Sequence, residues 1–359
     1  MAGYAIDRLL LLTASLTPAV ATSSSIGDPI IVSSSSLNGD RFRTYTTAAG
    51  IATDLSAGYL TSLAAAQATA ALAQDNRPTS VRVARFTVGS GETAWTGLQA
   101  AFAEGLTYGP VGISDRTDAT IAALATGLQS DATIKWLCPF VFQDSQSDWL
   151  SGIKPASLVA CENPQTRALA YNDGAVALDG ALLGRYSGYN FQTALLNGRG
   201  GCASKQRVSG IAASTFTAAQ DTAMLGIGVG VLEAFAPGTL SSTFVLLGEE
   251  AYDGATDWSA VLAITYLLRR AREELSALWL DYINDGQVIY ADRRGIALVS
   301  GVVSAVAQEL AGLWSPTEAL PNGWSVEGSV ASGIITITLT VSVAGEVTQI
   351  ALDVEGEVV

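Results

Sequence analysis

Adjacent acidic residues are the side chains in this sequence that come nearest to a catalytic arrangement. Two carboxylates can act as general acid and general base, and the pairs Glu249-Glu250 and Glu273-Glu274 place them side by side. Adjacent residues on a helix point in different directions, however, so we interpret these pairs as solvated or ion-paired surface. The 359-residue chain contains no histidine, which excludes Ser-His-Asp and Cys-His triads and histidine metal sites. The sequence therefore predicts no catalytic residue and argues against an enzyme.

A glycine cluster invites a nucleotide-binding interpretation. Gly226, Gly228 and Gly230 follow one another at every second position. No Gly-Lys-Ser/Thr follows them, and the Gly-x-Gly-x-x-Gly spacing is absent, so neither a P-loop nor a dinucleotide fingerprint is present. We interpret these glycines as close backbone packing in a strand, and we expect no cofactor.

The cysteines do not form a recognisable metal or disulfide motif. They are widely spaced, odd in number, and contain no Cys-x-x-Cys pair. We interpret them as small buried hydrophobic residues in a reducing compartment, and we expect no metal site. The three are Cys138, Cys161 and Cys202.

The composition of the chain argues against nucleic acid as a partner and favours contacts between protein subunits. The net charge is -14 and only 19 residues are Lys or Arg, which argues against nucleic acid because phosphate binding needs clustered basic residues. Hydrophobic residues make up 49% of the chain and charged residues only 14%. A large share of the surface should therefore be buried, much of it between subunits.

Two apolar stretches raise the question of a membrane. Residues 9–12, followed by Ala19-Val20-Ala21, imitate a signal peptide, but the charged region is weak and the apolar core is short. Residues 295–314 are mostly apolar, but Gln308 and Glu309 lie within them, and a glutamate at mid-membrane is costly. We predict a buried helix there and no membrane insertion.

Helices and strands alternate in the first part of the chain. Apolar runs with period-2 alternation are separated by alanine-rich segments of helical length, which favours a mostly parallel or mixed sheet covered by helices on both faces. The expected strands are 29–32, 80–88, 109–114 and 133–142, and the expected helices are 59–74, 93–106 and 118–130.

The C-terminal part begins with two amphipathic helices. Asp257 is placed to cap a helix over 258–283, and Arg269 and Arg270 precede Glu273 and Glu274 by four residues, as in intrahelical ion pairs. A second helix is expected over 293–313, followed by a proline-containing linker that ends at Trp324.

A strict alternation of apolar residues with Thr and Ser over 335–343 predicts a strand with one buried face. A second alternation around 350–354 predicts a hairpin with it across a glycine turn. An isolated hairpin is marginal in water, so its free edge must pair either with this chain's own sheet or with a neighbouring copy.

The sequence thus divides into an N-terminal arm (1–22), a mixed α/β domain (23–142), a glycine-rich middle region (143–254), a helical part of an α+β C-terminal domain (255–332) and a C-terminal β hairpin or arm (333–359).

Five segments then carry a family resemblance. They are the stretch from Leu9 to Pro18 ending Ser-Leu-Thr-Pro, the segment Arg43-Thr-Tyr45, residues 59–86 with Arg77-Pro78 and Val83-Ala-Arg85, the sequence Gly254-Ala-Thr-Asp-Trp258, and the sequence Tyr290-Ala-Asp-Arg-Arg-Gly295. In this order they resemble the contractile tail sheath proteins of phages and related injection machines, in particular the small sheath-like family.

The resemblance implies a structural subunit of a virion, assembled in the host cytoplasm. Such subunits form stacked hexameric rings around a tail tube, exchange terminal strands, and contract to drive the tube through the host envelope. The implied partners are other copies of the chain, the tube protein, and the baseplate and tail terminator proteins. The residues expected in the intersubunit arms are Leu9, Leu10, Leu11, Leu12, Ile350, Leu352 and Val354.

Basic residues in an otherwise acidic chain suggest a contact with an acidic tube. The candidates are Arg269, Arg270, Arg272, Arg293 and Arg294. Pairing within the helix, with Glu273 and Glu274, explains the first group equally well.

Two other classes of protein remain as alternatives. One is a different virion component, such as a tube or capsid protein, although the α/β first domain argues against a tube. The other is an α/β enzyme or small-molecule binding protein with an unrecognised site, which would have a deep polar pocket.

Overall fold

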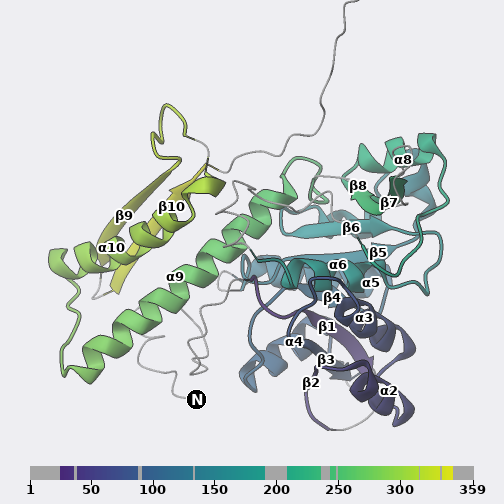
Figure 1. Cartoon of the computed structure of the whole chain (residues 1–359), viewed down its shortest axis with the longest axis horizontal. Helices are drawn as coiled ribbons and strands as arrows, with labels where there is room; N and C mark the ends of the chain where they lie inside the picture. The colour runs from purple at the N-terminus through teal and green to yellow at the C-terminus, as the bar shows by residue number, and fades with distance from the viewer. Residues whose placement is uncertain are drawn as a thin grey trace, which may run out of the picture.

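The computed structural model describes residues 25–35, 39–87, 91–131, 134–190, 208–235, 243–247, 250–314, 316–331 and 334–342. Figure 1 shows a large sheet covered by helices and, beside it, a long helix that leads to a smaller helix and a two-stranded sheet. The expected N-terminal arm and the last part of the expected C-terminal arm, with Leu9 to Leu12 and Ile350 to Val354, lie outside the described residues, as does Cys202.

The large sheet has eight strands in the order β2-β3-β1-β4-β5-β6-β7-β8. The six inner strands run parallel, and the two edge strands β2 and β8 pair antiparallel with their neighbours. This is the mixed sheet that the sequence predicts. The strands are β1 (Ile30–Ser35), β2 (Phe42–Tyr45), β3 (Val81–Thr87), β4 (Val111–Ile113), β5 (Phe140–Asp144), β6 (Thr166–Ala170), β7 (Val229–Phe235) and β8 (Thr243–Leu247).

Helices cover both faces of this sheet. Parallel strands need crossover connections, and helices supply them here. The helices are α2 (Ala48–Ser56), α3 (Ser62–Leu72), α4 (Ala94–Ala103), α5 (Asp118–Ser130), α6 (Leu178–Ser187) and α8 (Ala218–Leu225), with the 3₁₀ turns η1 (Ser147–Ser151) and η2 (Ala156–Cys161).

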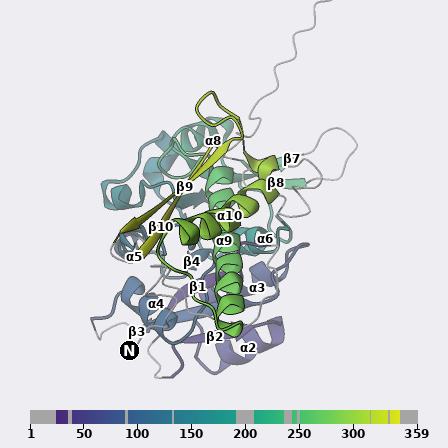
Figure 2. The same ribbon diagram turned by 90° about the vertical axis from the view of Figure 1, so that its left-hand side faces the viewer.

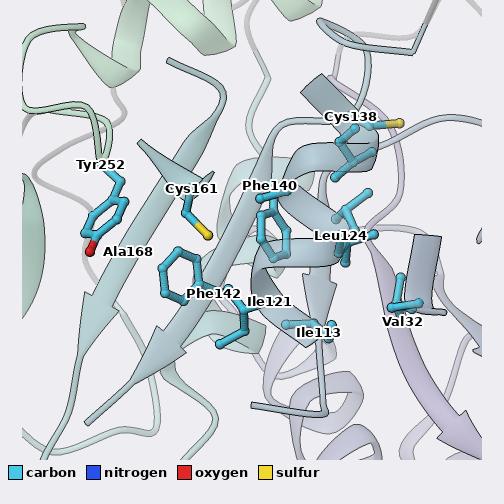
Figure 3. Close-up of a cluster of buried hydrophobic side chains, with 14 of the residues drawn as sticks. Val32, Ile113, Ile121, Leu124, Cys138, Phe140, Phe142, Cys161, Ala168 and Tyr252 are labelled. Atoms are coloured by element: carbon cyan, nitrogen blue, oxygen red, sulfur yellow. The ribbon is translucent and has the colours of Figure 1, made fainter. Parts of the chain in front are cut away.

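Successive residues of a strand serve different cores. Ile30 and Val32 pack in a cluster with α4 and α5, whereas Ile31 packs on the other face with α3. Figure 3 shows the first cluster, where Phe140 and Phe142 of β5 lie near Ile121 of α5. Because both faces are covered, β4, β5 and β6 are buried almost throughout.

Close backbone packing joins α3 to α6. Added Cβ atoms at Gly180 and Gly184 of α6 would come within 2.5 Å of the Cα atoms of Gln67 and Ala71 on α3. These glycines of the middle region therefore serve helix packing. Of the glycine cluster, Gly226 caps α8 and Gly228 adopts a φ of 73°, so only Gly230 lies within β7.

Most elements expected in the first part of the chain are confirmed, with the helix over 118–130 matching α5 residue for residue. The strand expected over 133–142 starts only at Phe140, because turns occupy residues 134–138. Helix α2 was not predicted. The sheet continues past residue 142, since β6, β7 and β8 come from the middle region.

The C-terminal part contains α9 (Trp258–Asn284), α10 (Arg293–Glu309), the short turn η3 (Ala311–Leu313), β9 (Trp324–Ala331) and β10 (Ile334–Val341). Figure 2 shows α10 crossing α9, with β9 and β10 beside it. Among the described helices, none is long and apolar enough to cross a membrane.

Candidate assembly surface

Helix α9 connects the two parts of the molecule. Asp257 caps it, as the sequence predicts, by accepting a hydrogen bond of 2.7 Å from the backbone N–H of Ser259. Its first half is buried against the large sheet, where Trp258 contacts Tyr186 of α6 at a centroid distance of 6.2 Å. Its second half packs on α10 through Leu275.

Arg270 ties α9 to α10. Its guanidinium lies 3.2 Å from Glu273, 3.0 Å from Glu274 and 3.3 Å from Glu309 of α10. Burial lowers the pKa of Arg270, but the hydrogen bond with Glu273 and the charge of Glu309 outweigh that effect and raise it. The side chain is only 7% exposed. Its position therefore favours internal pairing, the alternative that the sequence left open.

Arg269 and Arg272 face the large sheet domain. Arg269 donates to the carbonyl oxygens of Ile26, at 3.4 Å, and Tyr108, at 3.2 Å, and also pairs with Glu273. Arg272 lies over the ring of Tyr108 at 5.4 Å. The first described residues of the chain are thus fastened to α9.

Arg293 and Arg294 differ from the other candidates because both are exposed. They occupy the first turn of α10, after Asp292, which caps the helix by accepting from two backbone N–H groups at 2.9 Å. The N-terminal end of a helix carries partial positive charge, which adds to that of the two guanidinium groups. The N-terminal end of α10 is therefore a positively charged part of the surface of an otherwise acidic chain.

Exposed apolar side chains lie at the end of α9 and in the loop to α10. Two of them, Val288 and Tyr290, line a cavity of about 310 Å³ together with Arg294. Large apolar side chains grouped on a surface mark interaction sites more often than single ones do. The exposed fractions are 40% for Leu280, 52% for Ile283, 61% for Val288 and 70% for Tyr290.

Strands β9 and β10 form a separate antiparallel sheet that packs on α10. The alternation of β10 is confirmed, since Ile335 is 7% exposed and faces the cluster of Leu275, whereas Thr336 and Thr338 are exposed. Gly328 of β9 allows close contact, because an added Cβ would lie 2.4 Å from Ile296 of α10.

One strand of this small sheet was not predicted. Strand β9 follows the expected linker and pairs with β10, in register from Ile334 opposite Ala331 to Val341 opposite Trp324. The pairing of β10 with residues 350–354 stays a prediction, because those residues lie outside the described chain. Within the described residues, both outer edges of this sheet lack a partner strand.

Cys138 and Cys161 are free and buried, as predicted. The described residues contain no group of three or more His, Cys, Asp or Glu side chains that could hold a metal. Glu273 and Glu274 pair with arginines, in keeping with the interpretation of that acidic pair as ion-paired surface.

This fold, a doubly wound sheet followed by a long helix, a second helix and a small sheet, is similar to that of chains from contractile sheath and baseplate assemblies. A chain of the anti-feeding prophage baseplate, from a sixfold-symmetrised cryo-EM structure, matches 96% of this chain over 97% of its own length, with a TM-score of 0.66 and 11% identity. A chain of the contracted helical sheath of the same prophage matches 96% over 98%, with a TM-score of 0.60 and 10% identity.

The sheath tail protein of Listeria innocua matches 90% of this chain over 97% of its own length, with a TM-score of 0.56 and 9% identity. No family model and no curated protein matches the sequence. At these identities the likeness establishes the fold, and it spans both parts of the molecule.

Proposed function

We propose that the chain is the structural subunit of a contractile tail sheath, stacked in hexameric rings around a tail tube. The observation that carries this proposal is the match to sheath and baseplate chains over 96% of the sequence. The subunit acts without catalysis: contraction releases free energy stored in the extended lattice and drives the tube through the host envelope.

The open edges of the β9–β10 sheet are the proposed docking places for exchanged strands. A neighbour's N-terminal arm, with Leu9 to Leu12, and another neighbour's C-terminal segment, with Ile350, Leu352 and Val354, add to these edges by β-augmentation. Backbone pairing of this kind satisfies the unpaired N–H and C=O groups of both strands. It also tolerates rigid-body rotation of the attached domains during contraction.

Electron microscopy of the purified chain tests strand exchange. The full-length protein should form hollow cylinders or stacked rings in negative stain, whereas a truncation lacking residues 346–359 should stay folded and unassembled. Loss of folded protein in the truncation would show that this segment belongs to the chain's own core. Discrete particles at every concentration, even with tube added, would contradict the proposal.

For the tube contact, we propose Arg293 and Arg294. They are exposed, they lie at the positive end of α10, and exposed apolar residues adjoin them, whereas Arg269, Arg270 and Arg272 are engaged within the chain. Opposite charges on the tube would hold the sheath by interactions that salt weakens.

Charge reversal tests this contact. The variant Arg293→Glu should still form rings but should coat the tube less well, most clearly at low salt. Arg77→Glu, another exposed arginine changed in the same way, is the matched control. Equal coating by the two variants would remove this end of α10 as the tube contact.

A further inference from the structure

A cavity of about 500 Å³ opens at the carboxyl ends of β1, β4 and β5. Strand β1 lies between β3 and β4. The chain passes from β1 to β2 and β3 on one side of it and then crosses to β4 on the other side, so the strand order reverses at β1. Ligands of doubly wound sheets bind at such a switch point. We call it the switch-point cavity. Its lining residues used below are Ser34, Thr61, Ser114, Asp115, Arg116 and Asp144.

The positive charge of Arg116 is already neutralised. Its guanidinium lies 2.8 Å from Asp179, which is fully buried, and it also donates to the carbonyl oxygen of Gly174. Asp179 in turn accepts a hydrogen bond of 2.7 Å from Gln67 of α3. This network holds α3, α6 and the end of β4 together and leaves no net charge for a ligand.

Two carboxylates in the lining have no such cation. Asp115 accepts from the backbone N–H of Thr117, and Asp144 accepts from Ser145 and Gln146, all neutral donors. Burial, and then the neighbouring carboxylate of Asp118, raise the pKa of Asp144. An ionised carboxylate accepts several hydrogen bonds, so both retain capacity for a donor.

An unpaired hydroxyl also points to a ligand. Ser114 is 8% exposed, and its Oγ makes no hydrogen bond among the described residues. A buried polar group without a partner is uncommon in folded proteins. Ser34 and Thr61 add further hydroxyl groups to the same lining.

We propose that the switch-point cavity binds a small organic cation in which a protonated amine is combined with hydroxyl groups. The amine lies between Asp115 and Asp144, and the hydroxyls exchange hydrogen bonds with the serine and threonine side chains. The volume suits a ligand of the size of a monosaccharide rather than a bare metal ion, since a water molecule occupies only about 30 Å³. Binding here is independent of sheath assembly.

Calorimetric titration of the full-length chain with glucosamine, in 0.15 M salt to screen general attraction to an acidic protein, tests the proposal. We expect saturable binding of one molecule per chain. Glucose, which lacks the amine, should bind at least about tenfold more weakly, because charge-assisted hydrogen bonds are the stronger ones. Absence of saturable glucosamine binding, or equal binding of the two sugars, would overturn the proposal.

A matched pair of variants locates the site. Asp144→Asn should weaken glucosamine binding at least about tenfold, whereas Asp281→Asn, which removes one exposed carboxylate at the end of α9, should leave it unchanged. Equal weakening by both variants would indicate non-specific attraction and refute the assignment. The titration of the unmodified chain decides the matter if Asp144→Asn does not fold.

Discussion

Replacing Arg270 by methionine tests whether this arginine stabilises the fold or contacts the tube. Methionine keeps an apolar stem in the interface between α9 and α10 but removes the guanidinium shared by Glu273, Glu274 and Glu309. If Arg270 serves the fold, the isolated subunit should lose stability. If it serves the tube, only sheath–tube assembly should suffer.

The expected loss follows from the burial of the partners. Removing one member of a fully buried ion pair costs about 3 to 5 kcal/mol, because the remaining charge stays uncompensated. Here the three glutamates are 24%, 41% and 36% exposed, so water solvates them partly once the arginine is gone. We discount the loss to about 2 to 3 kcal/mol of unfolding free energy.

Equilibrium urea denaturation of the unassembled subunit measures this quantity. Arg293→Met is the control, because an exposed side chain outside such a network should change the stability by no more than about 0.5 kcal/mol. Indistinguishable midpoints and slopes for the two variants would refute the structural role of Arg270. That result would return Arg270 to the candidate tube contacts.

Three other predictions follow from burial and packing. Gly295→Ala should destabilise the chain by about 2 kcal/mol or more, because the added Cβ would lie 1.9 Å from a backbone carbonyl oxygen. Gly301→Ala, on the open side of the same helix, should instead stabilise the chain by up to about 1 kcal/mol. Denaturation measures both changes. Burial raises the pKa of the Cys138 and Cys161 thiols to about 12, so a thiol reagent should label these two residues only after unfolding. Peptide mapping separates them from Cys202, and rapid labelling of Cys138 or Cys161 in the folded chain would contradict their placement. Burial and the neighbouring carboxylate of Asp221 on α8 raise the pKa of Glu233, so ionising Glu233 lowers the stability of the folded chain as pH rises. Glu233→Gln should therefore have a higher Tm than the unmodified chain at pH 7. This difference should vanish at about pH 4 and below, where Glu233 is protonated in the unfolded chain as well.

Periodicity and capping were enough to predict α5 and α9. Both carry an apolar stripe at helical spacing, and α9 has an aspartate at its N-cap. Such signals are local, so they survive in a single sequence. The strands β1 and β3 were found from equally local signals, β1 as a short apolar run closed by serines and β3 by the alternation of apolar residues with arginines.

The middle region could not be predicted because its signals depend on partners elsewhere in the chain. Helix α6 has Ala177 at its N-cap, which offers no side-chain hydrogen bond, and Gly180 and Gly184 are unfavourable in a helix considered alone. Their purpose becomes evident only when α3 is packed against them. Strand β6 contains Arg167, which is fully buried and lies over Trp258, a residue far along the chain that no local pattern connects to it.

The position of Arg270 on its helix could have been predicted from the sequence, because the spacing of residues along α9 determines which of them are buried. Leu262, Tyr266 and Arg270 follow one another at intervals of four, so Arg270 continues a buried stripe of α9. That phase, which is a property of the sequence, distinguishes Arg270 from an exposed arginine. The acceptors of Arg269 were not predictable, because backbone carbonyl groups of Ile26 and Tyr108 leave no trace in residue type.

In the proposed sheath, the contacts of Arg269 determine how force passes from the N-terminal arm into the subunit. The described chain begins close to Ile26, which Arg269 holds against α9, and α9 also supports α10 and the sheet from which the C-terminal segment leaves. With 27 residues, α9 is about 40 Å long and acts as a single rigid element. In the proposed sheath, a pull on either arm therefore reaches the same helix, and the subunit responds as one body rather than by extending between its two parts.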